Sequence, residues 1–306
     1  MTTADDNPYD LLAEDHDEGH RWAFGTGFND PLAGIDSSVP PDVDAAALAR
    51  YCLALGDDAL IYSHRLQQWV TRMPELEEET AVANVALDLL GQARLLLARA
   101  GGILGRTEDD LAFFRAGPQF RKVRLAEHAD RDFAELVGRL LIFSTWRLAL
   151  FEALAIGAAD PVLADPVLAD PVLADPVLAD PVLAAIAAKG INEVAYHRDY
   201  AARWVIRLGD GTALSHARMQ AALDALWPLV AELFRPDPDA PGAADAAAFD
   251  AVIDTVLTQA TLGRPRPSPL APAGARAGRD GLHTEAMADI LAELQSVARA
   301  HPDATW

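Results

Sequence analysis

Residues 74–101 read PELEEETAVANVALDLLGQARLLLARAG and predict one long helix. Glu75 and residues 77–79 place carboxylates at the end where the helix dipole favours negative charge. Arg99 and the glycine that follows at position 101 are typical of the opposite end. Apolar residues recur between these ends at steps of three and four: Val82, Val85, Ala86, Leu89, Leu90, Ala93, Leu96, Leu97 and Ala100. Leu87 lies outside this stripe, so the helix is apolar nearly all round, and we expect it at the centre of a bundle or against a second chain.

One polar row interrupts that apolar surface. It consists of Asn84, Asp88 and Gln92, which are four residues apart and share one helix face. Helix bundles build their ligand and metal sites from inward polar side chains on facing helices. The row is therefore the first place to search for chemistry.

Charge and composition exclude several classes of protein. The chain has 306 residues and a formal net charge of −21, which would repel the phosphates of nucleic acid. Its single cysteine, Cys52, excludes an internal disulfide and fits a reducing compartment. The first residues lack the basic start and apolar run of a signal peptide. The most apolar segment, residues 136–159, is interrupted by Arg139, Arg147 and Glu152. We predict a cytoplasmic protein that binds neither nucleic acid nor membrane.

The chain divides into an acidic tail and one helical domain. Residues 1–43 are rich in Asp, Gly and Pro and predict a mostly disordered tail. Its aromatic residues either anchor the tail in a surface groove or are loosely held: Trp22, Phe24 and Phe28. Residues 44–306 show helical periodicity and no alternation typical of strands. Helices are expected over residues 43–72 with Asp44 as N-cap, 74–101, 108–115, 130–158, 182–208, 215–234 from Ser215, 246–262 and 282–300 from His283 or Thr284.

The two longest helix pairs are separated by a repeat. DPVLA occurs five times without variation over residues 160–184. Each proline lacks an amide donor and clashes with the preceding turn, so the repeat cannot form one continuous helix. We interpret it as a loop tolerated at the surface, where added length costs little stability; a lid or partner-binding arm is the alternative. Two helical hairpins joined by a long connection predict an all-α, ferritin-like four-helix bundle with additional C-terminal helices.

A bundle of this kind raises the question of a di-iron centre. Such a centre takes a Glu from each of two helices and a Glu-x-x-His pair from each of the other two. The nearest match is Glu193 with His197, which is spaced by four residues and has Tyr196 at the third. Asp88 is followed three residues later by Gly91. The predicted third helix offers Ser144 and Thr145 in place of a carboxylate. We therefore predict no metal, cofactor or catalytic residue on this chain.

The leftover polar residues have two interpretations. Asp58, Asp88, Glu193 and His197 form a degenerate, di-iron-like polar core with Arg65 or Arg94 as counter-charge, because a buried carboxylate needs a partner. Alternatively, Glu193 and His197 are an ordinary surface pair one turn apart, which is worth a few tenths of a kcal/mol (roughly).

Four stretches resemble the C subunits of bacterial ring-1,2-phenylacetyl-CoA epoxidases, also called phenylacetate-CoA oxygenases. These are LGDDALIYSHRLQQW (55–69), PELEEETAVANVALDLLGQAR (74–94), EVAYHRDYAARWVIRLGDGT (193–212) and GLHTEAMADILAELQ (281–295). The resemblance runs in order over residues 46–306. The N-terminal tail and four of the five DPVLA copies lie outside it.

The resemblance implies a ferritin-like, non-catalytic structural subunit of a hetero-oligomer. The catalytic A subunit would hold the di-iron centre and bind the CoA thioester, beside a small B subunit and a reductase with flavin and iron–sulfur groups. Such a complex uses O2 and NADPH to epoxidise the aromatic ring during phenylacetate degradation. Two alternatives stay open: a self-sufficient di-metal carboxylate oxygenase, and a bundle that binds a small molecule along the Asn84–Asp88–Gln92 row.

Overall fold

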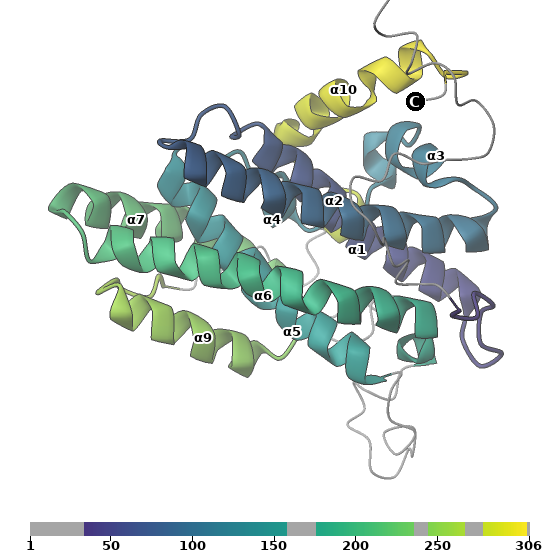
Figure 1. Cartoon of the computed structure of the whole chain (residues 1–306), viewed down its shortest axis with the longest axis horizontal. Coiled ribbons are helices and arrows are strands. Elements are labelled where there is room, and N and C mark those ends of the chain that lie inside the picture. The colour runs from purple at the N-terminus through teal and green to yellow at the C-terminus, as the bar shows by residue number, and fades with distance from the viewer. Residues whose placement is uncertain (1–33, 158–175, 236–243, 267–277, 305–306) are drawn as a thin grey trace, which may run out of the picture.

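The four-helix bundle is formed by two antiparallel hairpins (Figure 1). A computed structural model describes residues 34–157, 176–235, 244–266 and 278–304. The first hairpin consists of α1 (Ala45–Gln67) and α2 (Leu76–Leu104), and the second of α5 (Phe133–Gly157) and α6 (Pro181–Gly209). The described residues contain no strand. The all-α, ferritin-like architecture is therefore confirmed.

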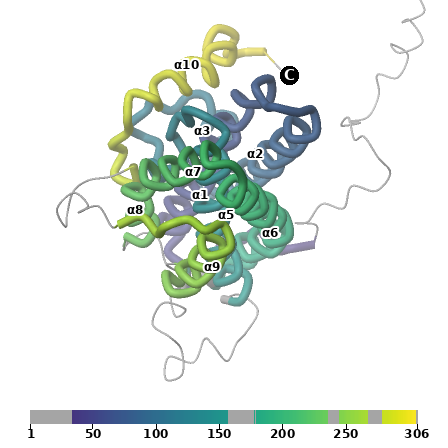
Figure 2. The backbone as a smooth tube through the Cα atoms, turned by 90° about the vertical axis from the view of Figure 1, so that its left-hand side faces the viewer, coloured from purple at the N-terminus to yellow at the C-terminus, as the bar shows by residue number. Residues whose placement is uncertain are grey.

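Shorter helices cover the sides of the bundle. They are α3 (Glu108–Phe113), α4 (Arg124–Glu127), α7 (Ala213–Leu226), α8 (Val230–Leu233), α9 (Ala246–Gln259) and α10 (Glu285–Ala300). α7 and α9 both pack against α5 and α6, whereas α10 contacts α1, α3 and α4. As a result, α9 and α10 lie on opposite sides of the bundle in both views (Figures 1 and 2).

Several helix ends differ from the sequence expectation. Asp44 caps α1 as predicted, since its carboxylate accepts hydrogen bonds from the amides of residues 46 and 47. Gly105, with φ of 67°, ends α2 instead of Gly101. A Cβ at Gly101 would lie 2.3 Å from the Arg106 carbonyl oxygen, so that glycine permits a close approach. Thr212 caps α7, and Ser215 completes the capping box from the third helical position.

The last DPVLA copy belongs to a helix. Asp180 caps α6 by accepting a hydrogen bond from the Leu183 amide at 2.8 Å, and Pro181 occupies the first helical position. The loop therefore ends at Asp180, and residues 181–184 form the first turn of α6. Residues 158–175 and the tail up to residue 33, with its three aromatic side chains, lie outside the described residues.

The core surrounds α5, and α2 lies at the edge. Every residue from 134 to 148 is buried, because α6, α7 and α9 cover α5. α2 buries one face on α1, but Leu87 is 59% exposed on the other. Among the described helices, α2 is long and apolar enough to span a bilayer by length and composition alone, a test that core helices of bundles also pass. From its sequence, we expect this helix either at the centre of a bundle or against a second chain. Since one face of α2 is exposed, contact with a second chain stays a prediction.

Candidate functional site

A polar row runs between α2 and α6, and we call it the α2–α6 seam. The two helices are antiparallel and paired along most of their length. The paired side chains are Glu78 with Tyr200 and Trp204, Asp88 with His197, Gln92 with Glu193, and Arg99 with Asp180. Because these pairs link the two hairpins, Asp88 and Gln92 of the predicted polar row face a helix from the other half of the bundle.

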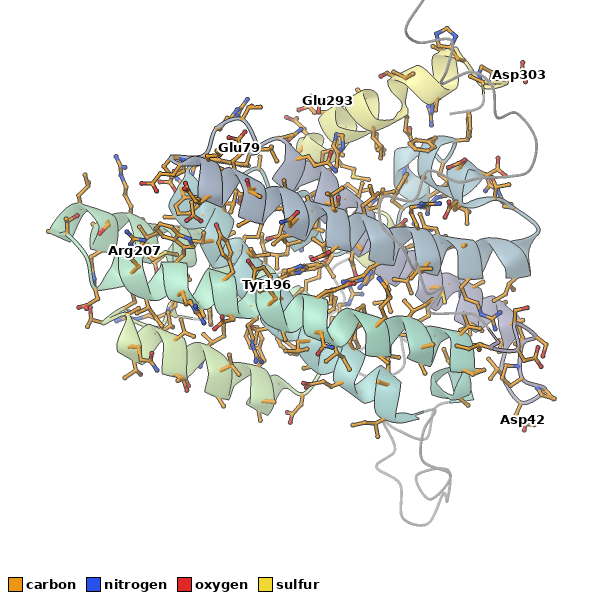
Figure 3. The ribbon with its side chains drawn as sticks, in the orientation of Figure 1. Asp42, Glu79, Tyr196, Arg207, Glu293 and Asp303 are labelled. Atoms are coloured by element: carbon orange, nitrogen blue, oxygen red, sulfur yellow. The ribbon has the colours of Figure 1, made fainter. Side chains whose placement is uncertain are left out.

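His197 and Asp88 form the centre of the seam. The His197 Nε2 lies 2.9 Å from the Asp88 Oδ2. His197 is only 1% exposed, whereas Asp88 is half-buried and Asn84 is exposed. The interpretation of Glu193 and His197 as a surface pair is wrong, because His197 points inward to α2. Tyr196, the preceding residue, is exposed on α6 (Figure 3).

Gln92 connects the seam to the interior of the bundle. Its amide nitrogen donates to the Glu193 Oε2 at 2.9 Å, and its Oε1 accepts from the Arg147 Nε at 2.9 Å. Lys189 pairs with the other oxygen of Glu193 at 2.9 Å. The amide therefore lies between a carboxylate on α6 and a guanidinium on α5, and both of its polar atoms are satisfied.

Arg147 is the buried cation of this site. It is fully buried, its NH1 donates to the Leu55 carbonyl at 3.4 Å, and its guanidinium lies 4.5 Å from the centre of the Phe151 ring. Burial lowers the pKa of Arg147 to about 10, while the negative charge of Asp58 opposes this shift. The guanidinium stays charged at neutral pH, so the bundle interior holds a fixed positive charge.

Asp58 does not join Asp88 and instead holds two other segments. Its Oδ1 accepts from the Val123 amide at 2.8 Å, and its Oδ2 pairs with Arg279 at 2.6 Å. Burial raises the pKa of Asp58, and the charges of Arg279 and Arg147 act against that rise. Asp58 is therefore a structural anchor for the chain before α4 and the chain before α10.

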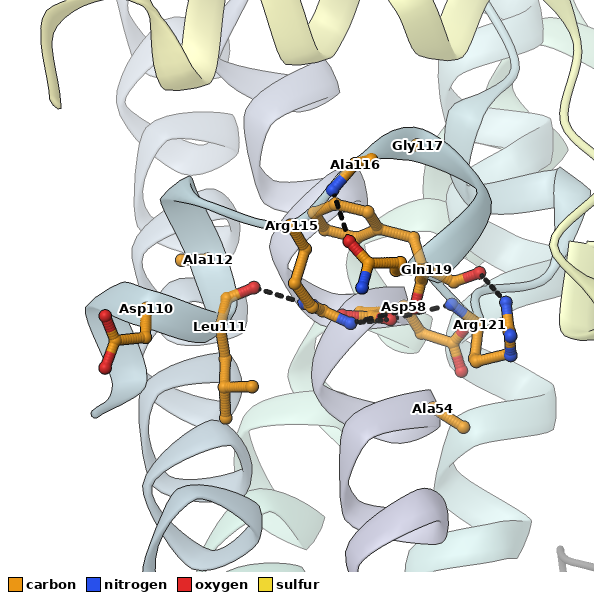
Figure 4. A network of polar contacts seen from close by, with 12 residues as sticks. Ala54, Asp58, Asp110, Leu111, Ala112, Arg115, Ala116, Gly117, Gln119 and Arg121 are labelled. Carbon is orange, nitrogen blue, oxygen red and sulfur yellow. Dashed lines mark hydrogen bonds and ion pairs between the residues drawn. The ribbon is translucent and has the colours of Figure 1, made fainter. Parts of the chain in front are cut away.

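The neighbouring Asp57 has a similar role on the same side of α1. It accepts a hydrogen bond from the Arg121 amide at 2.7 Å and pairs with the Arg115 guanidinium. Figure 4 shows Arg115 reaching from the end of α3 toward the loop that carries Gln119 and Arg121. These contacts fix the loop between α3 and α4 against the bundle.

The predicted counter-charges are wrong. Arg65 donates to the Glu127 carbonyl at 2.9 Å, and Arg94 pairs with Glu108 at 2.7 Å, so neither reaches the seam. Arg147 and Arg279 are the cations next to Asp58. The sequence does contain a signal for Arg147, because a charged residue inside a strongly apolar segment indicates a buried polar partner. From the sequence, we use that charge only as an argument against a membrane span.

The residues present do not fit a di-metal centre. Ser144 and Thr145 hydrogen-bond to carbonyls of their own helix, at 2.5 and 2.7 Å, and offer no carboxylate. Asp58 pairs with Arg279 and not with the seam residues. Gln92 is hydrogen-bonded to Arg147 in the bundle interior, and its side-chain amide is neutral. The seam joins the two hairpins, and its described residues do not supply the carboxylate and imidazole set that a di-metal centre takes.

Two comparisons with known proteins show which family the chain resembles. The family described as "Phenylacetic acid catabolic protein" matches residues 34–165 and 178–306. The chain is 37% identical over 270 residues to the C subunit of 1,2-phenylacetyl-CoA epoxidase from Escherichia coli (strain K12). That alignment covers 85% of this chain and 99% of the relative. The family match leaves the tail and residues 166–177 unmatched, within the DPVLA repeat.

Proposed function

Since this chain belongs to the phenylacetic acid catabolic protein family, we propose that it is the structural, non-catalytic subunit of a phenylacetyl-CoA 1,2-epoxidase. In this role it supports a catalytic A subunit that holds the di-iron centre and binds the CoA thioester. The complex would act in aerobic phenylacetate degradation in the cytoplasm, with a small B subunit and, transiently, a reductase that carries flavin and iron–sulfur groups and takes electrons from NADPH.

The observation that carries this proposal is the pair formed by Arg147 and Gln92. A di-iron centre needs carboxylates and imidazoles that converge on the middle of the bundle. Here a buried guanidinium and an amide fill that place, and Asp88 and His197 are already paired with each other. A protein without the ligands contributes to such a complex by shape and surface.

The outer face of α2 is the surface that we assign to the catalytic partner. Leu87 is exposed there, and two small residues, Gly91 and Gly102, have open space beyond their Cα atoms. A row of this kind allows a partner backbone to approach closely. Burying exposed apolar area at about 25 cal/mol per Å2 favours a permanent contact.

Co-purification of the two subunits tests the proposal. Leu87→Asp places a charge on the outer face of α2 and should release the catalytic partner, while the circular dichroism and unfolding midpoint of the isolated chain stay unchanged. The matched control is Leu214→Asp on α7, because Leu214 is 61% exposed and Leu87 is 59% exposed. Retention of the partner by Leu87→Asp, or equal loss in both variants, would contradict the assignment of this face.

A further inference from the structure

A second polar cluster lies at the start of α5 and uses no residue of the α2–α6 seam. It consists of His128, Asp130 and Glu135, which offer one imidazole nitrogen and two carboxylate oxygens. One ligand atom from each residue lies within 4.8 Å of the other two. None of the three belongs to the polar core that the sequence predicts.

One carboxylate oxygen of the cluster, the Asp130 Oδ1, is buried without a hydrogen-bond partner, whereas the His128 Nε2 lies 3.5 Å from the Glu135 Oε2. The Asp130 side chain is fully buried, and its Oδ2 pairs with Arg139. A buried carboxylate oxygen with no donor is unfavourable, so the Asp130 Oδ1 indicates a missing partner.

We propose that His128, Asp130 and Glu135 bind one divalent cation, and that the ligand set favours zinc. Zinc takes imidazole nitrogen and carboxylate oxygen, and three protein ligands leave the fourth position for water. The metal would occupy the position between the three ligand atoms and give the Asp130 Oδ1 its partner.

The surroundings orient the ligands as metal sites require. Arg139 holds the second oxygen of Asp130, and the Arg131 amide donates to the Glu135 Oε2 at 2.7 Å. Hydrogen bonds to the side chains that ligate a metal fix the orientation of those side chains. The His128 side chain is 27% exposed.

Arg131 competes with the proposed cation for the Glu135 carboxylate. Its side chain is 69% exposed and pairs with the Glu135 Oε1 at 2.5 Å, so it takes a ligand oxygen without contributing to the core. The Arg131 Nε also donates to the same oxygen at 2.6 Å. Removing this side chain should therefore free a carboxylate oxygen for the metal.

The test is titration of the full metal-free chain with zinc chloride against a chromophoric chelator. We expect about one zinc ion per chain. His128→Ala and Asp130→Asn should weaken binding by more than the roughly 10–100-fold that changes in outer-shell partners cost. Arg131→Ala should tighten it. The matched controls are His301→Ala, a histidine at the exposed end of α10, and Arg203→Ala, an exposed arginine that pairs with Asp199 at the same spacing.

Three results would overturn the proposal. They are the absence of zinc binding by the folded wild-type chain, zinc binding that survives both ligand variants, and Arg131→Ala binding no tighter than Arg203→Ala. Circular dichroism of each variant establishes that it is folded. If Asp130→Asn fails to fold, then His128→Ala and Arg131→Ala decide the question, because His128 and Arg131 are partly exposed. Neither readout depends on partner binding, so failure here leaves the proposed structural role intact.

Discussion

The Nε of Arg147 on α5 donates to the Oε1 of Gln92 on α2 at 2.9 Å, inside the bundle. The same amide binds Glu193 on α6, and the same guanidinium neutralises the surroundings of Asp58 on α1. These contacts connect all four long helices through one buried cation. Arg147 therefore both links the helices of the bundle and occupies, with Gln92, the interior where a di-metal centre would need carboxylates.

Arg147→Met tests the stabilising role of this cation. Methionine fills much of the volume, but it leaves the Gln92 Oε1 unpaired and removes a positive charge near Asp58. We expect a loss of about 1–3 kcal/mol in the free energy of unfolding, the cost of leaving a buried acceptor without its donor. Urea unfolding measures the loss. The matched control Arg203→Met, at an exposed position, should change stability by less than about 0.5 kcal/mol. Equal effects in the two variants would refute the role.

Asp180→Ala tests the anchor at the end of the repeat. Asp180 is fully buried, pairs with Arg99 and caps α6, so its removal combines a lost cap of about 1 kcal/mol with an unpaired buried arginine. Asp199→Ala removes an aspartate from an exposed pair with Arg203, which is worth about 0.2–1 kcal/mol. Thermal unfolding of both should show the larger loss for Asp180→Ala. A smaller loss for Asp180→Ala than for Asp199→Ala would show that the anchor is unimportant.

Deleting residues 160–174 tests whether the repeat is a tolerated loop. This removes three DPVLA copies and keeps Asp180 and the turn before it. Since the entropy of loop closure changes slowly with length, stability should shift by less than about 1 kcal/mol. Urea unfolding and co-purification with the partner are the two measurements. Loss of the partner alone would favour the binding-arm interpretation. Deleting residues 180–184 is the control, and this should destabilise the fold because it removes the cap of α6.

The contribution of three partly buried histidines to stability should fall as the pH drops below neutral. Burial lowers the pKa values of His64, His128 and His283, so the unfolded chain binds more protons than the folded chain once the pH falls below about 6.5. Their contribution is present above that value and is lost as the pH falls through the folded pKa values. Unfolding free energies between about pH 7.5 and 5.5, measured with chelator present, should decrease. His64→Gln should flatten this dependence. An unchanged slope would contradict the role of His64.

Much of the fold follows from the sequence because helix periodicity and capping are local signals. Asp44 caps α1, the hairpins form, and Glu193 and His197 both line one seam. Charge partners could not be predicted in the same way. Arg279 reaches Asp58 across 221 residues of sequence, and Arg147 reaches Gln92 across 55, so no local pattern contains either pair. The end of α2 is a local choice between two glycines, and the left-handed φ of 67° at Gly105 decides it.

The most direct test of the structural, non-catalytic role is the iron content of the chain purified alone and co-purified with its catalytic partner. We expect no bound iron on the isolated chain, and stoichiometric iron with NADPH- and O2-dependent epoxidation of phenylacetyl-CoA in the complex. A metal ion at the start of α5 is distinguished from a di-iron centre by its number, one per chain, and by its loss in His128→Ala. About two iron ions per isolated chain, lost on changing Glu193 or His197, would contradict this role and establish a di-metal oxygenase.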